Sequence, residues 1–400
     1  MNYIKHEDTN RKHYIDKDVY TAAKERLTDA ILQSDSQVVL WSGGKDSTVC
    51  LHLLRECYNE LDIHDKINVI FIDEEVISNH IIKYVRRVYD SHRYNMYWFN
   101  IPITCDIYNT GTTREYIQND PHRKTKVRHP PPEALTLKDF NLPNDTILTR
   151  YQLADLQASL FHGKVCLIKG IRCDESLFRL TQVLRRKTHP HIGGGANTSK
   201  HFECVPIYDW KEKDIWTYFH HNNIQYNPIY NHLMWSKAPL RVSTPLHPYN
   251  TQQYNKLRSI EPEFYENIVN VFPDMQHADR YNNSKIQTNH DFTEYPHTLT
   301  GLMQYVDDCY KDDPQEKHNV KKRLLWAYKK REQNKKRQYS DKFGGYPLYH
   351  LFRLTQRGAT MRNITPVDKP SRKMYTFEGY TEDDYIHDIK NRGKYNATNR

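Results

Sequence analysis

The sequence contains no long apolar run. A membrane-spanning helix needs about 20 consecutive apolar residues, and no stretch of the 400-residue chain approaches that pattern. The N-terminal segment MNYIKHEDTNRKHY also lacks the apolar centre of a secretory signal peptide. We therefore expect a soluble, cytoplasmic protein with no membrane partner.

Close pairs of cysteines are missing as well. The seven cysteines include no Cys-x-x-Cys spacing, whereas zinc and iron–sulfur ligands usually occur as close pairs. An odd number of isolated cysteines also argues against a disulfide framework. We expect no zinc or iron–sulfur site, and we predict reduced thiols at residues 50, 57, 105, 166, 173, 204 and 309.

Acidic residues are too few to balance the basic ones. Lys and Arg number 58 against 49 Asp and Glu, so the net charge is 58 − 49 = +9 at pH 7. This excess favours an anionic partner, such as a nucleotide, pyrophosphate or nucleic acid, without selecting among them. Aromatic residues make up 12% of the chain, which excludes a disordered composition because disordered chains are poor in aromatics.

Short apolar runs alternate with segments of helical periodicity in the first half of the chain. This alternation predicts βαβ units and therefore an α/β fold with a parallel sheet. The predicted strands are Val38–Trp41, Val69–Ile72, Met96–Phe99 and Val165–Lys169.

The strand–helix alternation stops near residue 245. We predict a helical lead-in (1–35), a nucleotide-binding domain (36–245) and a mainly helical, basic C-terminal region (246–400). Two polar segments interrupt the domain, residues 109–147 and the glycine-rich 188–201. Loops of this length are either functional lids or surface insertions, and both interpretations stay open.

The hexapeptide SGGKDS stands between the first predicted strand and the following helix. Two glycines allow a tight turn, and the N–H groups at a helix N-terminus bind anions. The serines add hydroxyl donors, the lysine adds a cation, and the aspartate is our tentative Mg²⁺ ligand. The spacing is not that of a Walker A loop. The predicted nucleotide-binding residues of this loop are Ser42, Gly43, Gly44, Lys45, Asp46 and Ser47.

Arg172 follows a predicted strand and Gly170, which places it at the carboxyl edge of the sheet, where open α/β proteins bind ligands. Its guanidinium is suited to clamp phosphate or sulfate oxygens, and we expect Asp174 and Glu175 to steady either Arg172 or the metal. The alternative is a surface ion-pair network around a helix cap.

Two further aspartates follow apolar runs. Asp73 comes directly after the second strand, which suits a ribose or metal contact, with a helix cap as the alternative. Asp209, with Glu212 three residues later, predicts a capping box at the start of the next helix.

The hexapeptide is the signature of the PP-loop ATP pyrophosphatases, and residues 36–245 resemble their PAPS reductase and sulfate adenylyltransferase small-subunit family. Three further segments carry the resemblance: Ile168–Arg179, Val205–Tyr230 and, more weakly, Arg241–Val242. The long C-terminal part and Ile72–Glu75 look more like the phage-associated IbrA-like subgroup, described as co-activators of prophage gene expression.

The resemblance implies a Rossmann-like, HUP-type adenine nucleotide alpha hydrolase core that binds ATP or an adenylyl sulfate with Mg²⁺. It adds Asp73, Gly170, Arg172 and Arg241 to the expected nucleotide contacts. The family's reductases carry a nucleophilic cysteine in a C-terminal tail, whereas here the only late cysteine is Cys309, among acidic neighbours. Thiol-dependent PAPS reduction is therefore not expected.

Two functions follow as hypotheses. The first is an enzyme of the ATP-pyrophosphatase or adenylyltransferase type, in which Lys45, Asp46 and Arg172 promote cleavage or adenylyl transfer at the α-phosphate. The second is a nucleotide-gated, nucleic-acid-binding regulator of the IbrA-like kind, phage-encoded and acting in the host cytoplasm with a protein partner.

A basic segment supports the second hypothesis. Between Lys317 and Arg337 stand ten Lys or Arg residues and one acidic residue, Glu332. On a helix they predict a basic face, including Lys329, Lys330 and Arg331, that meets nucleic-acid phosphates. The alternative is a solvated helix docked through its aromatic residues.

Overall fold

The computed structural model divides the chain into two compact units. The first comprises Met1–Cys105, Tyr116–Pro245 and Lys256–Phe272, and the second comprises Asp106–Glu115, Leu246–Asn255 and Pro273–Arg400. The expected division into 1–35, 36–245 and 246–400 stays a prediction. The residues that the structure describes are 15–109, 112–184, 186, 189–193, 200–238, 240–247, 254–276, 291–336, 343–355, 364, 366–367 and 371–387.

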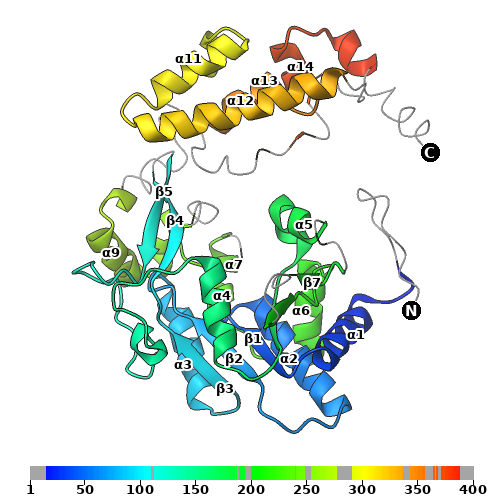
Figure 1. The fold of residues 1–400 in the computed structure, drawn as a ribbon, viewed down its shortest axis with the longest axis vertical. Helices are drawn as coiled ribbons and strands as arrows, with labels where there is room; N and C mark the ends of the chain where they lie inside the picture. The colour runs from blue at the N-terminus through cyan, green and yellow to red at the C-terminus, as the bar shows by residue number, and fades with distance from the viewer. Residues whose placement is uncertain are drawn as a thin grey trace. The chain divides into compact units, whose positions relative to one another are not determined.

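A six-stranded sheet forms the centre of the first unit (Figure 1). Its strands are parallel except for the edge strand β7, which runs antiparallel to β8. The predicted α/β fold is therefore confirmed, and each of the four predicted strands is present. In spatial order the strands are β3 (Asn95–Phe99), β2 (Asn68–Ile72), β1 (Ser36–Leu40), β6 (Val165–Lys169), β8 (His201–Cys204) and β7 (Ile192–Gly193).

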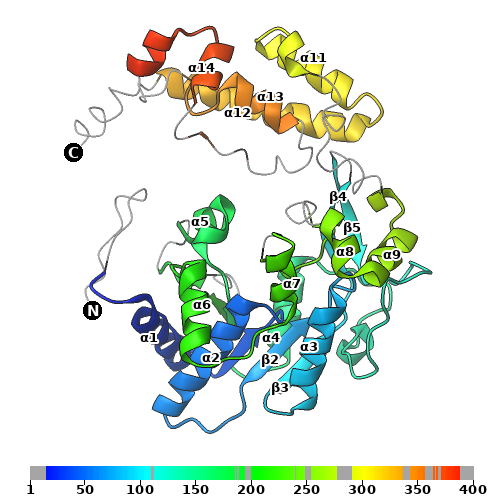
Figure 2. The same cartoon turned by 180° about the vertical axis from the view of Figure 1, so that it is seen from behind.

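Helices cover both faces of this sheet, as the two opposite views show (Figures 1 and 2). Further strands, β4 (Ile103–Asn109) and β5 (Thr112–Gln118), form a separate two-stranded sheet. The helices are α1 (Val19–Leu32), α2 (Lys45–Glu60), α3 (Asn79–Asp90), α4 (Arg150–Ser159), α5 (Leu177–Leu184), α6 (Glu212–His221), α7 (Ile229–Trp235), α8 (Tyr254–Ile260) and α9 (Pro262–Val271), with 3-10 turns η1 (Leu137–Phe140) and η2 (Cys173–Glu175).

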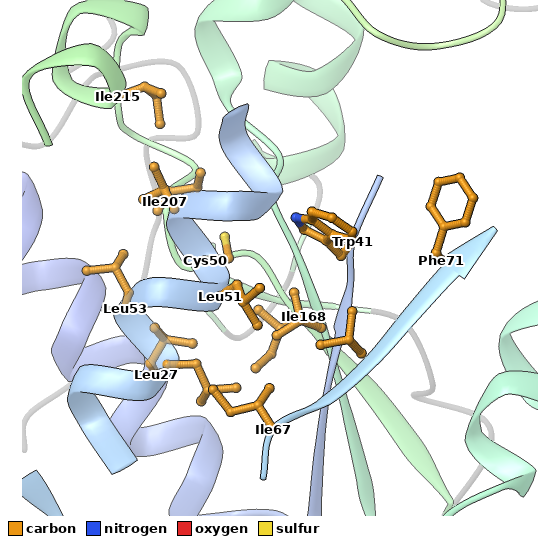
Figure 3. Packing of buried hydrophobic residues seen from close by; sticks show 14 of the residues in the cluster. Leu27, Trp41, Cys50, Leu51, Leu53, Ile67, Phe71, Ile168, Ile207 and Ile215 are labelled. Atoms are coloured by element: carbon orange, nitrogen blue, oxygen red, sulfur yellow. The ribbon is translucent and has the colours of Figure 1, made fainter. Parts of the chain in front are cut away.

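The side chains of the central strands alternate between two apolar clusters, as the pleat of a sheet requires. Val39 and Trp41 of the β1 segment join the cluster that contains α1, α2, α3 and α6, part of which Figure 3 shows. Val38 joins the cluster on the other face, together with Leu153 of α4. Both clusters fix the position of β1, so the loop that follows this strand starts from a rigid base.

The strand order reverses at β1, and this reversal positions the candidate site. β1 pairs with β2 on one side and with β6 on the other. In the β1–β6 pair Leu40 lies opposite Lys169, so both strands end at the same level. The segments that follow β1 and β6 therefore emerge side by side, at the switch point where open α/β sheets bind their ligands.

The second unit is helical over most of its described residues, as expected for the C-terminal region. Its helices pack around a core that includes Leu302, Leu324 and Phe352. They are α11 (Leu299–Cys309), α12 (Pro314–Lys336), α13 (Leu348–Thr355) and α14 (Arg372–Phe377), with one 3-10 turn, η5 (Phe292–Glu294).

Candidate functional site

The two glycines of the SGGKDS loop are required for different reasons, Gly43 by its backbone conformation and Gly44 by the close packing of its neighbours. Gly43 has φ = +71°, a left-handed backbone conformation that favours glycine. A Cβ atom on Gly44 would lie 2.8 Å from Val242 Cγ2 and 3.3 Å from the Tyr230 hydroxyl. The loop is therefore packed against neighbouring residues, and even a small side chain at residue 44 would displace them.

The loop presents backbone N–H groups at the N-terminus of α2. The first N–H groups of a helix have no intrahelical acceptor, and here the Lys45 N–H donates to the Tyr230 hydroxyl at 2.8 Å. Groups of this kind, with the helix dipole, favour an anion. The N–H groups that find no acceptor among the described residues are those of Gly43, Gly44, Asp46 and Ser47.

The two loop serines hold the turn closed. The Ser42 N–H donates to Ser47 Oγ at 3.2 Å, and the two hydroxyl oxygens are also 3.2 Å apart. Ser47 Oγ further donates to the Gly44 carbonyl at 3.2 Å. The hydroxyls that we expected to donate to a ligand therefore stabilise the loop in this structure.

Gly170 brings the end of β6 against the loop. A Cβ atom at this position would lie 2.5 Å from the Ser47 nitrogen and 2.6 Å from the Asp46 carbonyl carbon. These are backbone atoms and cannot move aside without shifting the first turn of α2. Gly170 is thus needed for close approach of two backbones, although its predicted contact with a nucleotide stays a prediction.

Arg172 and Asp46, which lie 126 residues apart in sequence, meet at the switch point. The buried Arg172 guanidinium donates from Nε to Asp46 Oδ1 at 2.5 Å and from Nη1 to Asp174 Oδ1 at 2.6 Å. Its Nη2 lies 3.9 Å from Glu175 Oε1. The prediction that Asp174 and Glu175 steady Arg172 is confirmed. The alternative, an ion-pair network around a helix cap, is also present, because Arg172 is the N-cap residue of η2 and the Asp174 side chain is 38% exposed.

Burial and neighbouring charges shift the pKa values of Arg172 and Glu175. Burial acts to lower the pKa of Arg172, but the carboxylates of Asp46, Asp174 and Glu175 raise it above its ordinary value. Burial raises the pKa of Glu175, and the charge of Asp46 adds to that effect. The cluster therefore holds a permanent cation among carboxylates, one of which is more easily protonated than usual.

The Lys45 side chain is also buried. Its ammonium donates to the Leu240 carbonyl at 2.9 Å and lies 3.4 Å from Asp46 Oδ2. In the same segment Arg241 Nη2 donates to the Glu175 carbonyl at 3.0 Å. Residues 240–242 therefore lie against both the loop and the segment after β6. Arg241 joins the predicted site residues in space through this contact.

Asp73 lies in a buried polar cluster at the end of β2. Its carboxylate accepts from Trp98 Nε1 at 2.9 Å and from the Glu75 N–H at 2.9 Å, and it pairs with Arg128. The helix-cap alternative is wrong, because the residue that caps α3 is Ser78. Contact of Asp73 with ribose or metal stays a prediction, and in this structure its oxygens already accept these hydrogen bonds.

The neighbouring Glu75 anchors part of the first polar interruption. It is buried, has φ = +60°, and accepts from the Asn119 N–H at 3.1 Å and the Val127 N–H at 3.0 Å. It also pairs with Arg123 at 2.6 Å. Residues 119–128 are thereby tied to the carboxyl edge of the sheet. In the second interruption residues 188 and 194–199 lie outside the described residues.

The capping box predicted from Asp209 and Glu212 is wrong. Helix α6 begins at Glu212, and its cap hydrogen bond runs from the Lys211 N–H to Asp214 at 2.7 Å. Asp209 instead pairs with the buried Arg26 at 2.7 Å. This ion pair joins segments that are 183 residues apart, and local spacing carries no signal for such a contact.

The assignment of Asp46 as a Mg²⁺ ligand stays a prediction, and in this structure its carboxylate faces two cations, Arg172 Nε at 2.5 Å and Lys45 Nζ at 3.4 Å. Across the described ranges no group of three or more His, Cys, Asp or Glu side chains is arranged to hold a metal ion. Mg²⁺ usually binds through one or two carboxylates together with substrate phosphates. One carboxylate beside the N–H groups of an anion-binding loop matches that pattern.

The basic segment forms much of α12, and one of its residues was wrongly assigned to the outer face. Arg331 is buried and forms a bidentate pair with Glu378, at 2.6 and 2.7 Å. Lys329 and Lys330 are exposed, as predicted. Residue 337 lies outside the described residues, and no helix among those described is long and apolar enough to span a membrane.

The uncharacterised protein YbdN of Escherichia coli (strain K12) is 30% identical over 258 residues, which cover 61% of this chain and 63% of YbdN. The chain thus spans less than two thirds of the length of that relative.

Two solved structures show more distant similarity. One is the FMN adenylyltransferase of Candida glabrata in complex with FAD and inorganic pyrophosphate, at 15% identity and a TM-score of 0.36, covering 54% of this chain and 59% of that one. The other is the PAPS reductase of Candida auris in a phosphate complex, at 14% identity and a TM-score of 0.33, covering 56% and 90%.

The family comparison covers the sheet and most of the site, but not residues 240–242. Residues 36–236, about half of the chain, match the phosphoadenosine phosphosulfate reductase domain. The matched range starts at β1 and includes the SGGKDS loop, Gly170 and Arg172. The chain therefore belongs to the phosphoadenosine phosphosulfate reductase domain family.

Proposed function

We propose that the chain binds ATP, or an adenylyl sulfate, together with Mg²⁺ at the SGGKDS loop and catalyses cleavage or adenylyl transfer at the α-phosphate. The observation that carries the proposal is the set of N–H groups at the N-terminus of α2 that have no acceptor among the described residues, beside Arg172 at the switch point. A polyphosphate is the ligand class that suits such a set.

The proposed reaction needs no nucleophile from the protein. An oxyanion of the acceptor attacks the α-phosphorus, the bond to the bridging oxygen breaks, and pyrophosphate leaves with the electron pair. Lys45 and Arg172, the two cations that contact Asp46, are the residues we propose to stabilise the negative charge that grows on the phosphate oxygens. Bound Mg²⁺ supplies further charge neutralisation, and Asp46 is the residue that would hold it.

The test is nucleotide-dependent thermal stabilisation, measured with and without Mg²⁺. ATP–Mg²⁺ at about 100 times its dissociation constant stabilises a binding protein by about 2.7 kcal/mol. Asp46→Asn keeps the size of the side chain but removes its charge, so we expect this stabilisation to be lost. Asp62→Asn, at a position 91% exposed and outside the site, is the matched control. Equal stabilisation in both variants would contradict the site assignment.

Thiol chemistry is not part of the proposal. Burial raises the pKa of Cys309 to about 11, and it also raises the pKa of Cys173, the residue next to Arg172, to about 11. Thiolate, the reactive form, is therefore scarce at neutral pH in both residues. We expect Cys309→Ser and Cys173→Ser to retain the turnover of the parent, measured as AMP and pyrophosphate release. Loss of turnover in a folded variant would restore thiol-based PAPS reduction.

A second function is a nucleotide-gated, nucleic-acid-binding regulator of the phage-associated IbrA-like kind, acting in the cytoplasm. The observation that favours it is the row of exposed lysines on α12, which includes Lys322, Lys329 and Lys330. Release of AMP and pyrophosphate distinguishes the two functions, because a sensor binds ATP without turning it over.

A further inference from the structure

The outer face of α12 combines lysines with an exposed aromatic ring. Trp326 is 49% exposed, and Lys322 and Lys330 lie four residues before and after it, with Lys329 three residues after it. Residues at these spacings share one face of a helix. The opposite face is fixed in the core of the second unit by Val320, Leu324, Ala327 and Arg331.

The lysines of this face differ from the other cations of the same helix. Lys321 pairs with Asp307 at 2.6 Å, and Arg331 pairs with Glu378. Over the ranges that the structure describes, no carboxylate pairs with the three lysines around Trp326. These lysines therefore have no ion-pair partner within the described chain. They share a helix face with Trp326, whose ring also packs edge-on against Tyr346 at a centroid distance of 6.2 Å.

We infer that this face binds single-stranded nucleic acid, with an unpaired base stacked on Trp326 and the flanking phosphates held by Lys322, Lys329 and Lys330. The inference rests on the regulator function proposed above and makes its ligand specific. A positively charged surface that carries exposed aromatic rings is the usual way to bind unpaired strands. A duplex would satisfy the lysines but would offer the ring no free base.

Two other partners fit this face less well. An anionic membrane would attract the lysines, but interfacial helices insert a broad apolar face. Here the apolar face of α12 is buried in the core. The large apolar residues of this helix that are exposed are Leu325 and Trp326, which do not form a broad apolar face. A protein partner would need acidic groups that match the three lysines. The combination of lysines with an exposed ring matches an unpaired strand more directly. Both alternatives are outcomes of the experiment below.

The experiment titrates the full chain with labelled oligothymidine, with a duplex of matched length and with anionic phospholipid vesicles, at several salt concentrations. We expect the single strand to bind most tightly. Trp326→Ala should weaken that binding by roughly 5- to 150-fold, the effect of losing one stacked base. It should leave the salt dependence unchanged, because no phosphate contact is lost.

Matched variants separate the two parts of the face. Trp235→Ala removes a tryptophan that is 80% exposed on α7, and it should leave binding unchanged. The triple change of Lys322, Lys329 and Lys330 to Gln should reduce the slope of log affinity against log salt by up to about 2, at about 0.7 per phosphate on a single strand.

Several results would overturn the inference: equal binding of single strand and duplex, equal effects of the two tryptophan variants, vesicle binding without oligonucleotide binding, or no binding at low salt. ATP-dependent thermal stabilisation of the same variants is measured in parallel. If that stabilisation persists while oligonucleotide binding fails, the nucleotide site stands and the single-strand site does not. A reduced slope of log affinity against log salt in the lysine variant, with no effect of Trp326→Ala, would overturn the stacking of a base on Trp326. Nucleic-acid binding through the lysines would then remain.

Discussion

Replacing Arg172 by Met is expected to lower the free energy of unfolding by about 3–5 kcal/mol, the usual effect of removing one partner from a buried ion pair. The guanidinium is buried and contacts Asp46 and Asp174, with Glu175 nearby. Methionine fills much of the space, but it removes the cation that these carboxylates share and, among the described residues, leaves only Lys45 beside Asp46 and Arg179 beside Glu175. Nucleotide-dependent stabilisation should be lost as well, because Arg172 is the proposed phosphate clamp.

The loss of unfolding free energy in Arg172→Met should be larger at neutral pH than at acidic pH. Burial already raises the pKa of Glu175 in the parent, and Arg172 is one of the charges that oppose this rise, so in the variant ionisation of Glu175 opposes folding more strongly. The deficit relative to the parent should be largest at neutral pH and should shrink as the pH falls below about 5. Chemical denaturation at neutral and acidic pH measures it.

Arg179→Met is the matched control for this prediction. Arg179 also contacts Glu175, at 2.7 Å, but its side chain is 37% exposed. Exposed ion pairs contribute at most about 1 kcal/mol. A deficit for Arg172→Met no larger than that of Arg179→Met would refute the view that Arg172 is the centre of a buried cluster.

Replacing Glu75 by Gln is expected to cost about 3 kcal/mol. The carboxylate accepts from two backbone N–H groups and pairs with Arg123. A glutamine amide cannot accept all of these bonds, and its NH₂ group would face other donors. The loss of stability should first appear as local unfolding of residues 119–128, because these contacts hold that segment against the sheet.

Limited trypsin digestion measures that local release. Residues 119–128 contain Arg123, Lys124, Lys126 and Arg128 as cleavage points. We expect cleavage in this segment to be faster in Glu75→Gln than in the parent. Glu266→Gln, an exposed position on α9, should leave the cleavage rate unchanged. Equal rates in the two variants would mean that Glu75 does not anchor the segment.

The sequence predicted four of the six strands of the central sheet and the position of Arg172 at its carboxyl edge, but it did not predict β7 and β8. Buried parallel strands are short apolar runs, so local composition was enough to locate β1, β2, β3 and β6. The site followed from one topological rule, since the carboxyl ends of neighbouring parallel strands share an edge. Neither step required knowledge of side-chain contacts.

Contacts between distant segments were outside the reach of such patterns. The Tyr230 hydroxyl meets the Lys45 N–H across 185 residues of sequence. Arg26 removes Asp209 from its expected capping role across 183 residues. On α12 the basic residues are so frequent that the sequence does not indicate which of them faces the core. Arg331 does so because it pairs with Glu378.

The close packing of the SGGKDS loop has a thermodynamic consequence. Its peptide groups lie against atoms of the surrounding fold: Gly43 against Val85, Gly44 against Val242, and the Asp46–Ser47 peptide against Gly170. The loop is therefore preorganised, and its N–H groups keep their direction before any ligand arrives. An anion that binds there pays little entropy for ordering the backbone, so more of its interaction energy remains as affinity.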